Sequence, residues 1–243
     1  MPQLGRDSYE FPPTEEALED PNGLLAFGGD LSIARLLSAY TRGIFPWFNP
    51  GQPILWWTPD PRTVFFPRDV HCSRSLQKFM RRSTWHVTID GRFAEVIEAC
   101  AALRSNSSGT WISPQMQLAY SQLHEVGYAH SVEVWDGDQL TGGLYGVAIG
   151  RAFFGESMFS TASNASKVAL ICLARFLQRH GFELFDAQVA SEHLFTMGAR
   201  TISRETFEGL LAQACREPYI SDMQTVWHEA KKKLISNDGH ILN

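Results

Sequence analysis

Apolar and polar positions alternate with two different periods along this chain, and together they predict a mixed α/β protein. Apolar residues recur at intervals of three and four, the spacing of an amphipathic helix, in five long segments. We expect helices over residues 31–40, 73–82, 93–104, 114–127 and 164–180, with a short helix near Glu192 and a last one from Ser203. Strand-like patterns predict strands over residues 131–135, 140–149, 151–158 and 182–189.

Residues at the ends of these segments support the helix boundaries. Asp30 is placed to cap the first helix, and Ser113 to cap a helix that has Pro114 in its first position. Gly181 follows the long helix and is typical of a left-handed stop. The hydroxyl of Ser203 is placed to cap the last helix.

The composition changes near Pro61, where we place a domain boundary. Residues 1–61 are rich in proline, glycine and tryptophan and predict a small N-terminal α/β domain. Residues 62–243 carry the β–β–β–α–β–α order, which resembles the core of acetyltransferase-like (GNAT) folds, and end in a polar tail from Ser236. The long helix should connect two parallel strands by a right-handed crossover. Ligands in such sheets bind beyond the carboxyl ends of strands, where Asp186 and Gln188 fall.

Composition narrows the classes of protein. With 44% hydrophobic and 19% charged residues the chain is typical of a folded globular protein. No apolar run reaches roughly 18 residues, so we expect no membrane span. The N-terminal residues lack the apolar core of a signal peptide. Four cysteines without a C-x-x-C pair favour reduced thiols in a cytoplasmic protein.

The net charge of −5 hides a basic stretch. Residues 62–92 contain seven arginines and lysines but only two aspartates, so the formal charge of this stretch is +5. Such a patch can bind phosphates in a salt-dependent way. A solvated basic helix without a ligand is an equally good interpretation of the charge pattern alone.

Several common chemistries lack their motifs. The chain has no H-E-x-x-H, and its eight histidines are widely spaced, so we expect no metal site. It has no phosphate loop of the G-x-x-x-x-G-K-[ST] form, which disfavours an ATPase. A G-x-S-x-G elbow is also missing, which disfavours a serine hydrolase. The acetyl-CoA loop of GNAT enzymes has no match either, because residues 142–146 do not fit its pattern.

Eight motifs occur in order between Phe11 and Thr206, at regular spacing. They are NGLLAFGGDL (22–31), RGIFPW (42–47), WWTPDPR (56–62), GTWI (109–112), HSVEVW (130–135), GESMFS (155–160), NASK (164–167) and FDAQ (185–188). Together they closely resemble the bacterial leucyl/phenylalanyl-tRNA–protein transferases.

This resemblance implies an activity, partners and a fold. Members of the family move Leu or Phe from Leu-tRNA or Phe-tRNA to the N-terminal Lys or Arg of a protein, which marks the product for degradation. They act as cytoplasmic monomers with a small N-terminal domain and a GNAT-like domain. The tRNA ester is already activated, so we expect no cofactor and no metal.

The resemblance also assigns catalytic roles to Asp186, Gln188 and Glu156. An α-amine has a pKa near 7.7–8.0, so deprotonating it at neutral pH costs only about 1–1.4 kcal/mol. Holding amine and ester in attack geometry contributes on the order of 7–11 kcal/mol. Because an amide is hardly basic, we interpret Gln188 as an acceptor that positions the amine, with Asp186 orienting it. Glu156 would hold the α-ammonium of the donor amino acid.

Substrate-binding residues follow from the same resemblance and from the predicted elements. The apolar pocket for Leu or Phe should include Leu144, Phe154, Met158, Leu170 and Phe185, while Trp47 and Trp111 would stack on the terminal adenosine. The basic helix should hold the tRNA backbone through Arg74, Lys78, Arg81 and Arg82. Core packing remains the alternative for the apolar residues and the tryptophans.

Two other functions stay open at this point. One is an acyltransferase that uses acyl-CoA, and the other is a tRNA- or peptide-binding module without catalysis. The second would have been favoured by loss of Asp186 or Gln188, and both are present.

Overall fold

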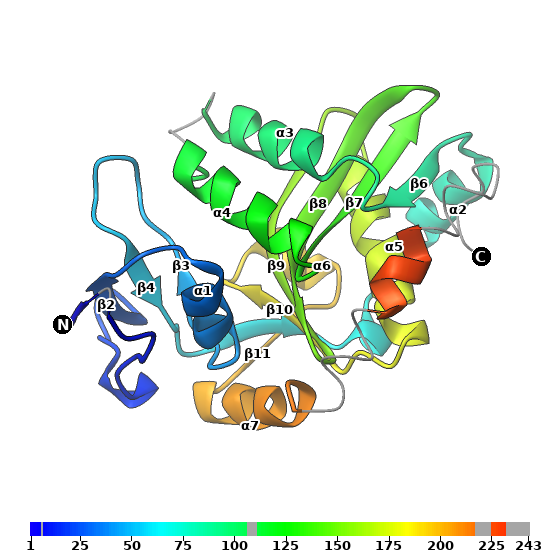
Figure 1. Ribbon diagram of the computed structural model, residues 1–243. Helices are drawn as coiled ribbons and strands as arrows, with labels where there is room; N and C mark the ends of the chain where they lie inside the picture. Colours follow the sequence, from blue (N-terminus) through cyan, green and yellow to red (C-terminus); the bar gives the residue numbers. More distant parts are fainter. Residues whose placement is uncertain (6, 106–110, 217–224, 232–243) are drawn as a thin grey trace.

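The computed structural model describes the whole chain except residues 6, 106–110, 217–224 and 232–243. The predicted polar tail from Ser236 therefore lies outside the described residues. Two sheets organise the molecule, a small one at the N-terminus and a large one that follows it (Figure 1). The chain passes from one sheet to the other between Trp57 and Arg62, the interval that contains Pro61. The predicted mixed α/β class is confirmed.

The small sheet has the strand order β1-β2-β4-β3. Its strands are β1 (Gln3–Leu4), β2 (Leu24–Gly28), β3 (Phe45–Pro46) and β4 (Leu55–Trp57), and a 3₁₀ turn, η1 (Thr14–Glu16), precedes β2. Helix α1 (Ile33–Tyr40) begins two residues later than predicted, because its N-cap is Ser32, whose hydroxyl accepts from the N–H of Arg35. Asp30 instead accepts from the N–H of Ser32, so the predicted Asp30 cap is wrong.

The large sheet has the order β11-β5-β10-β9-β8-β7-β6. Its strands are β5 (Arg62–Phe65), β6 (His86–Ile89), β7 (Ala129–Asp136), β8 (Gln139–Ile149), β9 (Ala152–Ser160), β10 (Leu184–Gln188) and β11 (Arg200–Ile202). Strands β7, β8 and β9 form an antiparallel meander, whereas β9 and β10 are parallel and are connected through α5 (Ala165–Arg179). The predicted parallel crossover is confirmed. Strands β5, β6 and β11 were not predicted.

Helices cover both faces of the large sheet (Figure 1). Helices α3 (Phe93–Ser105) and α4 (Pro114–Glu125) lie over one face, and α5 lies over the other. Ser113 caps α4 through the N–H of Met116, as predicted. A separate hydrophobic cluster fills each side, and the α3/α4 cluster also contains Leu25 and Trp56 of the small sheet. The two sheets therefore share one core.

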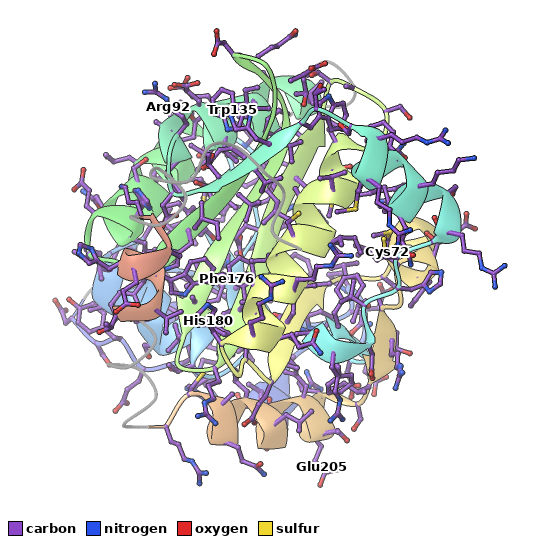
Figure 2. All side chains as sticks on the ribbon, turned by 90° about the vertical axis from the view of Figure 1, so that its right-hand side faces the viewer. Cys72, Arg92, Trp135, Phe176, His180 and Glu205 are labelled. Carbon is purple, nitrogen blue, oxygen red and sulfur yellow. The ribbon has the colours of Figure 1, made fainter. Side chains whose placement is uncertain are left out.

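The remaining elements lie at the edges of the large sheet. They are η2 (Pro67–Asp69), α2 (Arg74–Arg82), α6 (Glu192–Thr196) and α7 (Arg204–Ala214). Ser203 caps α7 through the N–H of Thr206, but α7 is not the last helical segment, because residues 225–231 are also helical. Trp227 of that segment stacks on His130 with ring centroids 4.0 Å apart. Figure 2 shows α5 across the face of the sheet, with Phe176 on the side of this segment. Among the described residues, no helix is long and apolar enough to cross a membrane.

Candidate active site

A mostly apolar cavity of about 390 Å³ lies where strands β8, β9 and β10 meet β3 and α6. Its lining includes eight residues that the sequence analysis assigned to the site, namely Trp47, Trp111, Leu144, Glu156, Met158, Leu170, Phe185 and Gln188. The structure thus gathers into one cavity side chains that lie up to 141 positions apart, from Trp47 to Gln188. Asp186 lies directly behind it, fully buried.

Phe154 does not line this cavity, which corrects its predicted place in the pocket. Its ring belongs to the hydrophobic cluster on the α3/α4 face and lies 5.1 Å from the ring of Tyr40. Leu144 and Phe185 belong to the cluster on the opposite face. Phe154 therefore contributes to the core beneath the site.

A buried ion pair fixes Asp186. Arg62 Nε donates to Oδ1 at 2.9 Å and Arg62 Nη2 donates to Oδ2 at 2.7 Å, and neither side chain is exposed by more than 1%. The guanidinium lies between the rings of Phe45 and Phe207, 4.8 Å and 4.6 Å from their centroids. Such a bidentate pair has a defined geometry as well as balanced charge. Asp186 is thereby held rigidly, with its charge compensated.

Gln188 adopts an unusual backbone conformation that depends on Asp186. Its φ is 62°, in the left-handed region, and the register of β10 against β5 shifts between Asp186 and Gln188. A non-glycine residue in that region costs about 1–3 kcal/mol unless its surroundings hold it. Asp186 Oδ1 holds it by accepting from the N–H of Gln188 at 2.9 Å. Asp186 therefore orients Gln188 through the backbone.

The side chain of Gln188 points from this bend towards Glu156. Its Nε2 donates to Glu156 Oε1 at 2.8 Å. Within the described part of the chain, no donor reaches its carbonyl Oε1. The residue is half-buried and lines the cavity. The amide thus presents a fixed hydrogen-bond acceptor at the polar end of an apolar cavity.

Glu156 is buried and accepts three hydrogen bonds. Tyr40 of α1 donates to Oε1 at 2.7 Å, Tyr120 of α4 donates to Oε2 at 2.8 Å, and Gln188 is the third donor. The pKa of Glu156 is raised to about 7. Burial is the largest cause and the charge of Asp186 also raises it, whereas the two tyrosine hydrogen bonds lower it. The carboxyl group is therefore close to half-ionised at neutral pH.

Both tyrosines remain neutral donors. Burial, together with the adjacent Glu156 charge, raises the pKa of Tyr40 and the pKa of Tyr120 well above the ordinary value. Their oxygens also lie 2.5 Å apart, and because each hydroxyl has one proton, a hydrogen bond between them uses the proton that one of them otherwise donates to Glu156. The carboxyl of Glu156 is thus held by α1 of the N-terminal part and by α4, which packs on the large sheet.

The sequence patterns do not mark Tyr40, Tyr120 or Arg62 as site residues. Both tyrosines lie on apolar faces of predicted helices, so their pattern indicates core packing. Arg62 lies two positions before the apolar residues 64–66, and a charge beside a buried run indicates a paired partner. That signal pointed to an ion pair but not to Asp186.

The predicted tRNA-binding cations lie away from the cavity. Arg74, Lys78, Arg81 and Arg82 are all exposed along α2, where they line a shallow cavity of about 400 Å³. Trp47 is 45% exposed and packs against Trp57, with ring centroids 5.5 Å apart. In the described ranges, no group of three or more His, Cys, Asp or Glu side chains is placed to hold a metal ion.

Comparison with known proteins assigns the family. Residues 64–212 match the family model for leucyl/phenylalanyl-tRNA protein transferase, and residues 29–60 match the model for the N-terminal domain of the same family. The leucyl/phenylalanyl-tRNA–protein transferase of Cellvibrio japonicus is 57% identical over 229 residues, which are 94% of this chain and 97% of that relative. The protein of the same name from Pseudomonas syringae is 58% identical, over 90% of this chain and 96% of the relative. The solved structure of L-PGS from Bacillus licheniformis aligns with a TM-score of 0.40 at 8% identity, over 79% of this chain and 73% of that one. The chain belongs to the leucyl/phenylalanyl-tRNA–protein transferase family.

Proposed function

We propose that this protein transfers Leu or Phe from Leu-tRNA or Phe-tRNA to the N-terminal Lys or Arg of acceptor proteins, as a cytoplasmic monomer without a cofactor. The observation that carries the proposal is the fixed Gln188 amide at the polar end of the apolar cavity. The names of the relatives supply the reaction class.

The reaction is aminolysis of an ester. The α-amine of the acceptor forms a bond with the ester carbonyl carbon, the bond from that carbon to the ribose oxygen breaks, and a proton passes from the amine to that oxygen. Gln188 Oε1 accepts a hydrogen bond from the incoming amine and holds it in line with the carbonyl. The Arg62–Asp186 pair acts by fixing the backbone of Gln188.

Glu156 holds the α-ammonium of the donor amino acid. Its Oε2 accepts only from Tyr120 within the described residues, so a second acceptor position remains on that oxygen. A cation beside the carboxyl lowers its pKa and keeps it ionised. Donor binding and ionisation of Glu156 therefore support each other.

The apolar wall selects the donor side chain. Leu144, Met158, Leu170 and Phe185 line a volume that is large enough for Leu or Phe and that gains less from a smaller side chain. One methylene changes such binding by about 1–3 kcal/mol, so the preference is one of size. Met158 can adapt its shape to either donor.

The terminal adenosine would stack between Trp47 and Trp111 at the mouth of the cavity. The exposed cations of α2 would contact the tRNA backbone, with little dependence on sequence. Together these contacts would place the ester beside Gln188.

The test is transfer of labelled Phe from Phe-tRNA to a peptide that begins with Arg, with the same peptide beginning with Ala as the control. Transfer to the Arg peptide alone supports the proposal, and no transfer contradicts it. Incubation with acetyl-CoA and the same peptide tests the acyl-CoA alternative. Asp186→Ala should abolish most transfer in protein that circular dichroism shows to be folded, although it leaves Arg62 buried without its partner and should cost about 3–5 kcal/mol in urea unfolding.

A further inference from the structure

A second cavity, of about 500 Å³, lies between η2, α2 and α5. We call it the α2–α5 groove. Arg68, Arg74 and Arg175 line it, and Gln77 and Gln178 add amide groups. A third of its lining residues come from α5, on which only Leu170 was expected to contact a ligand.

The groove is strongly cationic. Arg175 and Arg74 form no ion pair among the described residues, so their charges are available to a ligand. The acidic residue on the wall is Asp69, which pairs with Arg200 at 3.2 Å and with Arg68 at 3.9 Å. The cavity along α2 continues the groove, because Arg74 and Gln77 line both. A continuous band of positive charge therefore runs from α5 across α2.

The groove adjoins the active-site cavity. Leu170 lines the active-site cavity and the next residue, Ile171, lines the groove, so α5 is a common wall. On the other side, His71 of the groove donates its N–H to the carbonyl of Met197 at 2.8 Å, directly after α6. A chain that leaves the active-site cavity past α6 would thus meet the groove next.

Lys167 supplies positive charge at this junction. It lies one turn before Ile171 on α5, and its charge reaches His193 at the edge of the active-site cavity. Burial lowers the pKa of His193, and the Lys167 charge lowers it further. Positive charge therefore continues from the cavity edge along α5 to Arg175.

We infer that the α2–α5 groove binds the phosphodiester backbone of the tRNA acceptor stem, with Arg175 and Arg68 as phosphate-binding residues beside the α2 cations. This inference rests on the proposed function. Guanidinium groups bind phosphate oxygens in a bidentate way, and amide side chains add hydrogen bonds. Such contacts fix the position of a nucleic acid without selecting its sequence. An acceptor protein that begins with Lys or Arg would be repelled there.

Charge reversal at Arg175 tests the inference. Arg175→Glu should raise the KM for Phe-tRNA about tenfold at 0.15 M salt and reduce the slope of log KM against log salt concentration by about one or more. The control is Arg92→Glu, the same charge change on an exposed residue that Figure 2 shows far from Cys72 of the groove. This control should leave both quantities unchanged.

A donor without a stem separates the groove from the catalytic site. The probe is 3′-O-phenylalanyl-adenosine, which fills the active-site cavity but does not reach the groove. Its transfer to an Arg peptide by Arg175→Glu should stay within about twofold of the wild type. Because Arg175 is half-buried, Arg68→Glu, on a side chain that is 77% exposed, repeats the test without altering packing.

The outcomes are distinct. An unchanged KM for Phe-tRNA in both variants overturns the inference. If the small donor loses activity as much as Phe-tRNA does in Arg68→Glu, the effect is not on the stem and the inference is also overturned. Failure of the wild type with both donors would instead contradict the proposed function.

Discussion

Replacing Glu156 by Gln should stabilise the protein at alkaline pH and weaken donor binding. In the folded protein the carboxyl group keeps its proton until about pH 7, whereas its ordinary pKa is 4.5. Between these values the folded state binds more protons than the unfolded state, so the stability contributed by Glu156 falls as pH rises. Glutamine has no proton to lose and is nearly the same size.

The magnitude follows from the shift. A difference of about 2.5 pKa units corresponds to a loss of about 3 kcal/mol of stability, which is complete above the folded pKa and nearly absent below the unfolded pKa. The free energy of unfolding of Glu156→Gln, minus that of the wild type, should therefore rise by about 3 kcal/mol between about pH 4.5 and about pH 8. Taking the difference cancels the other titrating groups.

Urea unfolding followed by tryptophan fluorescence at several pH values measures this difference. At the same time the KM for Phe-tRNA should rise, because the donor ammonium loses its charged partner. A difference in unfolding free energy that stays constant with pH would refute the raised pKa. An unchanged KM would refute the ammonium role.

Three further predictions concern the groups around the site and the core. Tyr120→Phe removes a hydrogen-bond donor to Glu156, so the pKa of Glu156 should rise by about one to two units. Single-turnover transfer needs ionised Glu156, so the acid limb of its pH profile should move to higher pH by the same amount. An acid limb that does not move would contradict the role of the hydroxyl. Arg62→Met leaves Asp186 buried without its partner and should cost about 3–5 kcal/mol in urea unfolding. Adding Asp186→Leu should restore stability but not transfer, and restored transfer would show that the pair is dispensable. Trp227→Ala should cost about 3–5 kcal/mol of unfolding free energy, because Trp227 is 2% exposed and packs in the hydrophobic cluster on the α5 side of the sheet. A loss below about 1 kcal/mol would show that the helical segment 225–231 does not stabilise this cluster.

The regular part of the fold was predictable because its hydrophobic periods are long. Helix α5 and strands β7, β8 and β9 each bury most of their residues, and their patterns extend over eight residues or more. Strand β5 has only four residues, all buried, and begins with Arg62, whose charge hides the strand pattern. Its place in the sheet depends on pairing with β10, which is distant in sequence. Local patterns do not contain such pairings.

The site was predictable in its residue types more than in its contacts. Of the three residues to which the resemblance assigned catalytic roles, Glu156 and Gln188 line one cavity and Asp186 lies behind it, in contact with Gln188. It did not reveal that Asp186 acts on the backbone of Gln188, because that contact depends on a bend in β10 at a residue with positive φ. The partner Arg62 and the donors Tyr40 and Tyr120 likewise come from elements that meet only in the folded chain.

The central claim is that Gln188 holds the attacking amine against the ester. The most direct measurement is the single-turnover rate of Phe transfer to an Arg peptide by Gln188→Ala, with folding verified by circular dichroism and with saturating Phe-tRNA. Misplacing the reacting groups by about 1 Å costs on the order of 100-fold in rate, so we predict a fall of about that size. A rate within about threefold of the wild type would contradict the claim.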